Sequence, residues 1–268
     1  MEVNGLEFHV RDAGSGTPVI LLHGFPDTGH VWRNQVRALA GAGFRTIVPD
    51  LRGRGRSAKP TAVTDYRLPA IVKDVTGMLD ALGIERAHVV GHDWGAGVAW
   101  LTAMLAPQRV DRLVAISVGA PGAGKPTLED LQKGWYRLLF LSDEAEALIQ
   151  RDDWALFRMF LGGAADTDAY IQTLSEPGAL AAGLNWYRAN LRIEQLAGGS
   201  GGPGLPKVQA RTLGIWSTGD LYLTEEAMTR SAERVTGGWR YERVEGGHWV
   251  PIDQAGRLNA LLVEFLSA

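Results

Sequence analysis

The 268-residue sequence contains no cysteine, which excludes disulfide frameworks, thiolate zinc sites and cysteine nucleophiles. It also lacks an excess of basic charge. Its 27 Lys and Arg residues against 30 Asp and Glu give a net charge of −3, which provides no strong positive field for nucleic acid. No segment approaches the roughly 18 consecutive apolar residues that a membrane-spanning helix needs. We therefore expect neither a nucleic-acid nor a membrane partner.

The N-terminal residues Met1–Gly5 lack the basic stretch and apolar run of a signal peptide, so we expect a cytoplasmic protein. The hydrophobic fraction of 46% is typical of a globular chain that buries a sizeable core. Glycine is abundant, with 34 residues, which predicts many tight turns and close backbone approaches. The length favours one large domain or a core with an insertion.

Short apolar runs alternate with helix-length segments along the chain. The runs that predict buried strands are 19–22, 46–48, 88–90, 113–116, 212–217 and 240–244. The segments that predict helices are 32–42, 68–82, 96–106, 225–235 and a last one that ends near Phe265. This alternation predicts the α/β class, with a mostly parallel sheet covered by helices on both faces.

The alternation is interrupted between Pro121 and Pro206. This interval contains mainly helical segments rich in Leu, Ala, Trp and Tyr, followed by a Gly/Pro-rich stretch at 198–204 that predicts a hinge. The sequence therefore predicts an α/β core built from residues 1–120 and 206–268. Residues 121–205 are expected to form a helical insertion.

The loop at 91–95 reads Gly-His-Asp-Trp-Gly and lies between a predicted strand and a predicted helix. It has the G-x-nucleophile-x-G form of a nucleophile elbow, with Asp93 where many hydrolases have serine. The turn places Asp93 at a helix N-terminus, where the helix dipole favours its anion. The alternative interpretation is an ordinary N-cap aspartate.

Two further loops follow predicted strands, at the sheet edge where ligands of open α/β sheets bind. In the loop at 23–27, Gly24 permits a turn whose Phe25 N–H could converge with the N–H of Trp94 to form an oxyanion hole. In the loop at 246–249, His248 occupies the late position where an elbow enzyme needs its base. Asp220 is the predicted acid partner, because the other usual position, after the strand at 113–116, has no carboxylate.

Two other motifs point to different classes of protein. Residues 119–125 fit the G-x4-G-K frame of a phosphate-binding loop, which makes a nucleotide-binding protein a rival hypothesis. Pro126 follows where Ser or Thr should hold Mg²⁺, and it has no N–H to offer a phosphate. Residues 198–202 match G-x-S-x-G, but no predicted strand or helix flanks Ser200, so we interpret this stretch as a linker.

Four motifs together resemble the α/β-hydrolase family, in its epoxide hydrolase and haloalkane dehalogenase branch. They are His-Gly-Phe-Pro at 23–26, Asp-Leu-Arg-Gly-Arg-Gly-Arg-Ser at 50–57, the elbow at 91–95 and Gly-His-Trp at 247–249. The resemblance covers essentially the whole chain and is closest to soluble epoxide hydrolases. It implies the α/β-hydrolase fold, with the insertion at 121–205 as a helical cap.

The resemblance implies that Asp93 attacks a substrate carbon and forms an ester that His248-activated water then hydrolyses, with Asp220 orienting His248. A carboxylate is already ionised at neutral pH, so it needs no base for the first step. The family places two cap tyrosines over the nucleophile to protonate the epoxide oxygen; Tyr187 and Tyr136 match them. The implied substrate pocket is lined by Phe25, Trp94, Trp186 and Trp249.

The expected activity is hydrolysis of a small apolar epoxide to a vicinal diol, without a metal or organic cofactor. The alternative with the same triad is a haloalkane or haloacid dehalogenase. Many dehalogenases have asparagine where Phe25 stands, and fluoroacetate dehalogenases have arginine at the position of Trp94, so both residues favour the epoxide. A non-catalytic ligand receptor on the same fold is a further alternative. The chain is expected to be a monomer or a homodimer.

Overall fold

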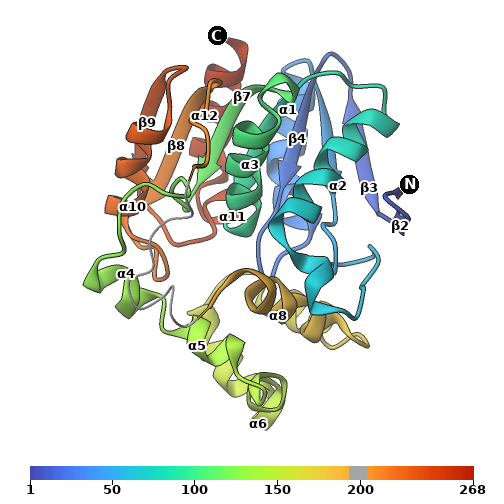
Figure 1. Cartoon of the computed structure of the whole chain (residues 1–268), viewed down its shortest axis with the longest axis vertical. Helices are drawn as coiled ribbons and strands as arrows, with labels where there is room; N and C mark the ends of the chain where they lie inside the picture. Colours follow the sequence, from blue (N-terminus) through green and yellow to red (C-terminus); the bar gives the residue numbers. More distant parts are fainter. Residues whose placement is uncertain (193–203) are drawn as a thin grey trace.

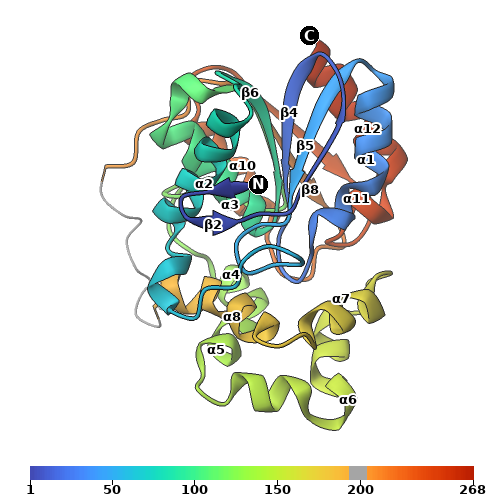
Figure 2. The ribbon, with the colours of Figure 1, turned by 90° about the vertical axis from the view of Figure 1, so that its right-hand side faces the viewer.

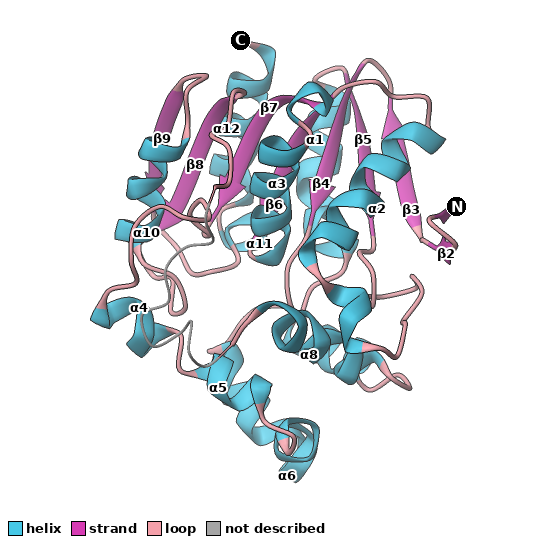
Figure 3. Ribbon diagram, viewed as in Figure 1, coloured by secondary structure: helices cyan, strands magenta, loops and turns pink. Residues whose placement is uncertain are grey.

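The computed structural model describes residues 1–192 and 204–268, and Figures 1 and 2 show it from two sides. A seven-stranded sheet runs through its centre in the order β3-β5-β4-β6-β7-β8-β9 (Figure 3). The strands are β3 (Val10–Gly14), β4 (Thr17–Leu22), β5 (Phe44–Pro49), β6 (Ala87–His92), β7 (Val110–Ile116), β8 (Arg211–Ser217) and β9 (Trp239–Val244). A separate small hairpin pairs β1 (Glu2–Val3) with β2 (Leu6–Glu7).

The sheet is parallel except for the edge strand β3, which pairs with β5 antiparallel. The central strands consist largely of Val, Ile, Leu and Ala, and β6 is buried along its whole length. Strands covered on both faces need such continuous apolar sequences. The predicted α/β class and mostly parallel sheet are therefore confirmed, and each of the six predicted strands lies within an observed one.

Helices cover both faces of the sheet. Figure 2 shows α2 (Leu68–Ala81) and α3 (Trp94–Leu105) on one face. It shows α1 (Arg33–Gly41), α11 (Val250–Asp253) and α12 (Ala255–Ser267) on the other. Short helices α10 (Glu225–Thr229) and η4 (Arg230–Arg234) lie between β8 and β9, where one longer helix was expected. None of the helices in the described residues combines the length and apolar character needed to cross a bilayer.

The described residues between β7 and β8, where the sequence predicts the helical insertion, form five helices, and Figures 1 and 2 show them gathered beyond the lower edge of the sheet. They are α4 (Leu128–Lys133), α5 (Tyr136–Leu141), α6 (Ala145–Leu161), α7 (Thr167–Leu174) and α8 (Ala179–Asn190). The backbone of α6 is non-helical at residues 151–154. The predicted hinge at 198–204 lies, except for Gly204, outside the described residues, as does Ser200.

The strand order reverses at β4, because β5 pairs with one side of it and β6 with the other. Loops that leave the carboxyl ends of β4 and β6 therefore run apart, and such a reversal opens a crevice for ligands in α/β sheets. Leu22 of β4 pairs with Gly91 of β6, so the loops that begin at residues 23 and 93 start side by side. The fold thus brings the first and second motif loops to one point.

Candidate active site

Asp93 occupies a sharp turn between the last residue of β6 and the first of α3. Its backbone has φ 53° and ψ −123°, a conformation that side-chain-bearing residues rarely adopt and that tends to occur at functional sites. The flanking glycines make the turn possible. A Cβ on Gly91 would lie 2.2 Å from the carbonyl oxygen of Gly95, and one on Gly95 would lie 2.1 Å from that of Leu22. The strand-turn-helix context predicted for the elbow is therefore present.

The Asp93 carboxylate meets the first motif loop directly. The N–H of Phe25 donates to Asp93 Oδ1 at 2.9 Å, and a Cβ on Gly24 would lie 2.3 Å from the same oxygen. Only glycine at position 24 lets the loop approach so closely. Burial raises the pKa of Asp93, while His248 and the backbone N–H groups of Phe25 and Trp94 oppose this rise. Both N–H groups therefore stabilise negative charge on this carboxylate.

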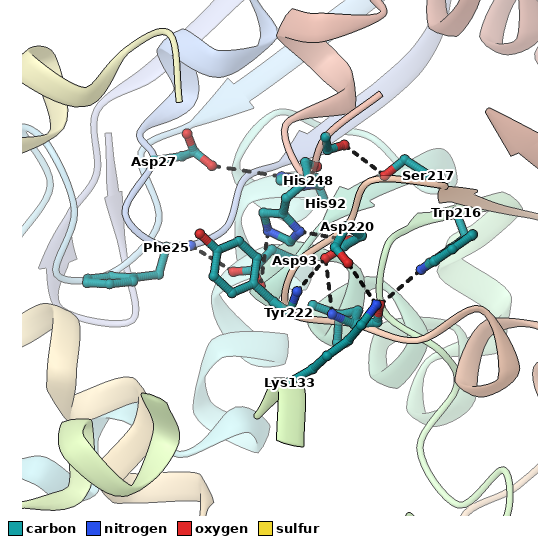
Figure 4. A network of polar contacts seen from close by, with 12 residues as sticks. Phe25, Asp27, His92, Asp93, Lys133, Trp216, Ser217, Asp220, Tyr222 and His248 are labelled. Atoms are coloured by element: carbon teal, nitrogen blue, oxygen red, sulfur yellow. Dashed lines mark hydrogen bonds and ion pairs between the residues drawn. The ribbon is translucent and has the colours of Figure 1, made fainter. Parts of the chain in front are cut away.

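His248 links Asp93 to Asp220, as Figure 4 shows. Its Nδ1 lies 2.9 Å from Asp220 Oδ2, and its Nε2 lies 3.8 Å from Asp93 Oδ2. The N–H groups of Tyr222 and Leu223 donate to Asp220 Oδ1 at 2.9 and 3.0 Å, which fixes that carboxylate. The loops that follow β8 and β9 thus place Asp220 and His248 so that His248 lies between Asp220 and Asp93.

The charges of this trio depend on one another. Burial alone would lower the pKa of His248, but the Asp220 and Asp93 carboxylates raise it to about 9. Burial acts to raise the pKa of Asp220, but His248 and two backbone N–H groups hold it below its ordinary value. The Asp220 and Asp93 carboxylates thus favour the charged form of His248, and His248 in turn favours the charged form of Asp220.

Asp93 opens onto a cavity of about 220 Å³. The residues that line it are Asp93, Trp94, Gly97, Val118, Tyr136, Arg137, Tyr187, Leu191 and Leu223. Tyr136 begins α5 and Tyr187 lies on α8, and their ring centroids are 6.2 Å apart. Burial raises the pKa of both phenols, so both are protonated at neutral pH and available as donors. The structure thus brings both predicted tyrosines to the predicted nucleophile.

The four predicted pocket aromatics occupy different positions. Trp94 lines the cavity, whereas Phe25, Trp186 and Trp249 are buried beside it and are not among its lining residues. Phe25 packs edge-on against Tyr187, with ring centroids 5.7 Å apart. Trp186 donates its indole N–H to the Arg52 carbonyl at 3.0 Å. The ring of Trp249 packs perpendicular to that of His248 at 5.0 Å. These three rings therefore pack around the site without lining the cavity itself.

Two buried ionisable residues of the site were not predicted from the sequence. Asp27 is fully buried, 3.8 Å from His92 Nδ1, and burial raises its pKa to about 7. Arg54 is also buried, and its guanidinium carbon lies 4.7 Å from the ring centroid of Phe25. Both belong to motifs that the sequence shows plainly, since Asp27 follows His23–Pro26 directly. Their burial was the missing information.

The segment that matches the phosphate-loop pattern, residues 119–125, packs against other parts of the chain. The N–H of Ala120 donates to Ser231 Oγ at 2.8 Å, and a Cβ on Gly119 would lie 2.1 Å from the Ala227 carbonyl oxygen. The loop is thus packed against the residues that follow β8 rather than arranged to hold a phosphate. Within residues 1–192 and 204–268, no group of His, Asp or Glu side chains is placed to hold a metal ion.

This chain belongs to the alpha/beta hydrolase fold family, whose sequence profile matches residues 17–255. It is similar to a protein named epoxide hydrolase A from Mycobacterium tuberculosis, with 32% identity over 100% of this chain and 96% of that protein. It is also similar to a protein named epoxide hydrolase from Caballeronia sordidicola, with 30% identity over 98% of this chain and 91% of that protein.

A solved structure of an epoxide hydrolase from Bacillus megaterium, in complex with an inhibitor, matches with a TM-score of 0.89 and 26% identity. The match covers 100% of this chain and 99% of that one. The similarity therefore includes helices α4–α8 as well as the sheet.

Proposed function

We propose that this protein hydrolyses an epoxide to a vicinal diol through a covalent ester on Asp93. The observation that carries this proposal is a buried carboxylate on a nucleophile elbow, opening onto a cavity that two protonated tyrosines share. Relatives along nearly the full chain are named epoxide hydrolases, which supports the same substrate. Asp93, Asp220 and His248 act as the triad, and Tyr136 and Tyr187 act as proton donors.

In the first step, Asp93 Oδ2 attacks an epoxide carbon. Oδ1 is held by the Phe25 N–H, so Oδ2 is the oxygen free to form the new bond. As the Oδ2–carbon bond forms, the ring carbon–oxygen bond breaks, and the departing oxygen takes a proton from Tyr136 or Tyr187. The phenol proton removes the need for a free alkoxide, which is a poor leaving group.

In the second step, water attacks the carboxyl carbon of the ester. Esterification removes the charge of Asp93, one of the charges that raise the pKa of His248 to about 9, so the imidazolium gives up its proton, which restores the tyrosine phenol that donated in the first step. Neutral His248 then removes a proton from the attacking water, and negative charge develops on Oδ1, where the N–H groups of Phe25 and Trp94 stabilise it. The bond between the carboxyl carbon and Oδ2 then breaks, Oδ2 takes the proton from His248 and leaves with the diol, and the new carboxyl group returns its proton to His248.

The core and the cap contribute different groups to the proposed reaction. Residues 1–120 and 206–268 form the core that carries the triad and the oxyanion hole. The cap predicted at residues 121–205 supplies the tyrosines from α5 and α8, which lie in its described part. Trp94 lines the cavity, and Phe25, Trp186 and Trp249 are buried beside it, which helps to exclude bulk water from the reaction.

The experiment that tests this function traps the ester. His248→Gln should stop the second step, so that incubation with an epoxide adds the mass of the substrate to the intact protein. Asp93→Asn is the matched control and should show no adduct. An adduct in both variants, or in neither, would exclude the ester mechanism.

The substrate class is tested by measuring diol formation from epoxides and halide release from haloalkanes and haloacids with the same purified protein. Faster halide release would assign a dehalogenase. Tight ligand binding without turnover of any of these compounds would assign a receptor.

A further inference from the structure

The cavity over Asp93 contains one cationic side chain among its lining residues from the described parts of the chain. Most of the lining is apolar, contributed by Trp94, Val118, Leu191 and Leu223. The polar lining residues are Asp93, the two tyrosines and Arg137, which follows Tyr136 on α5. A cation in such a lining has little water to compensate its charge, so it interacts strongly with an anion that enters.

The guanidinium of Arg137 lies next to the proton-donor end of the cavity. Its central carbon is 5.7 Å from the ring centroid of Tyr136. Gly134 leaves room for it, because a Cβ there would lie 3.1 Å from that carbon. The side chain therefore has space beside the tyrosine.

The carboxylate of Asp130 on α4, whose charge acts on Arg137, already accepts hydrogen bonds from other groups. Asp130 Oδ2 accepts from the N–H and the hydroxyl of Thr127 at 2.7 and 2.8 Å, and its Oδ1 accepts from the Thr224 hydroxyl at 2.5 Å. Among residues 1–192 and 204–268, no carboxylate forms an ion pair with Arg137. The carboxylate of Asp93 faces His248 instead.

We propose that the preferred substrates are epoxides that carry a carboxylate, which Arg137 binds while the oxirane lies between Asp93 and the two tyrosines. A guanidinium binds a carboxylate through two parallel N–H donors, which fixes orientation as well as position. The cavity is smaller than the roughly 300–1,000 Å³ typical of sites for drug-sized ligands, so the acid is a short one. This inference rests on the proposed epoxide hydrolysis and narrows its substrate class.

Arg137 has one other role open to it, which is to act only through Tyr136. Burial raises the pKa of Tyr136, and the positive charge of Arg137 opposes that rise. In that role it would promote the opening of every epoxide to the same degree. The two roles differ in whether the charge of the substrate matters.

The test compares 5,6-epoxyhexanoate with 5,6-epoxyhexanamide, which have the same number of non-hydrogen atoms and differ in charge. The wild-type kcat/KM should favour the acid by on the order of 10- to 100-fold, as expected for a charge-assisted contact. Arg137→Gln should bring the ratio of the two values close to one, and Arg137→Lys should keep part of the preference. Arg151→Gln is the charge-matched control, because the Arg151 side chain is 70% exposed on α6.

A wild-type ratio of one or below would overturn the proposal. If Arg137→Gln lowers kcat/KM for both epoxides and leaves their ratio unchanged, the proposal would also be overturned. That result would indicate that Arg137 acts only through Tyr136. Binding of hexanoate and hexanamide by calorimetry gives a readout without turnover. Preferential binding of hexanoate that Arg137→Gln abolishes, in a protein that hydrolyses neither epoxide, would retain the anion site and reject the proposed activity.

Discussion

Replacing Asp27 with Asn should make the protein more stable, and increasingly so as the pH rises. Burial, with a contribution from the Asp93 charge, raises the pKa of Asp27 from 3.8 to about 7. Between these values the folded state keeps a proton that the unfolded chain releases, so the wild type loses stability as the pH rises through this window. A shift of about three pKa units corresponds to roughly 4 kcal/mol, as an upper limit, once the pH exceeds 7. Asparagine is neutral throughout and avoids this loss.

The measurement is the free energy of unfolding by urea for both proteins between about pH 5 and pH 8. The advantage of Asp27→Asn should grow by a few kcal/mol across that range. His248 also titrates there, but it does so in both proteins and largely cancels in the difference. Asp152→Asn, whose side chain is 76% exposed, is the control and should follow the wild type. A difference that stays constant or shrinks with rising pH would refute a buried, proton-retaining Asp27.

Four further substitutions test the elbow, the triad and the cap. Gly95→Ala should destabilise the fold by more than about 3 kcal/mol, because the added Cβ meets the Leu22 carbonyl oxygen at 2.1 Å. Gly97→Ala on the same helix meets nothing within 4 Å and should stabilise by up to about 1 kcal/mol. Equal shifts in melting temperature would contradict both. Asp220→Asn should lower steady-state turnover by on the order of 10⁴-fold, with a burst of ester still visible by rapid quench; an unchanged rate would remove Asp220 from the triad. Tyr187→Phe should slow ester formation by roughly 10²-fold in single-turnover fluorescence, and an effect confined to ester hydrolysis would argue against proton donation.

The central strands could be predicted because burial on both faces requires apolar residues along their whole length. Strands such as β4 and β6 are buried on both faces, so they appear as continuous apolar runs whatever surrounds them. The edge strand β3 was not predicted. The residues of β3, Val10–Gly14, are partly exposed, so they do not form a continuous apolar run. They form a strand because they pair antiparallel with β5. The predicted helix at 225–235 likewise divides into α10 and η4.

The parts of the site that depend on local backbone geometry could be predicted from the sequence alone. A turn as tight as the one at Asp93 tolerates only glycine at its flanks, so the motif is visible without a structure. The pKa shifts of the site residues became visible only in the folded structure, because they depend on burial and on charges from distant parts of the chain. Burial gives Asp27 a pKa of about 7, and two carboxylates from separate loops raise that of His248. The position of Arg137 in the cavity wall beside Tyr136 is likewise known only from the folded structure. The spacing of residues along the chain does not predict how helices pack against the edge of a sheet.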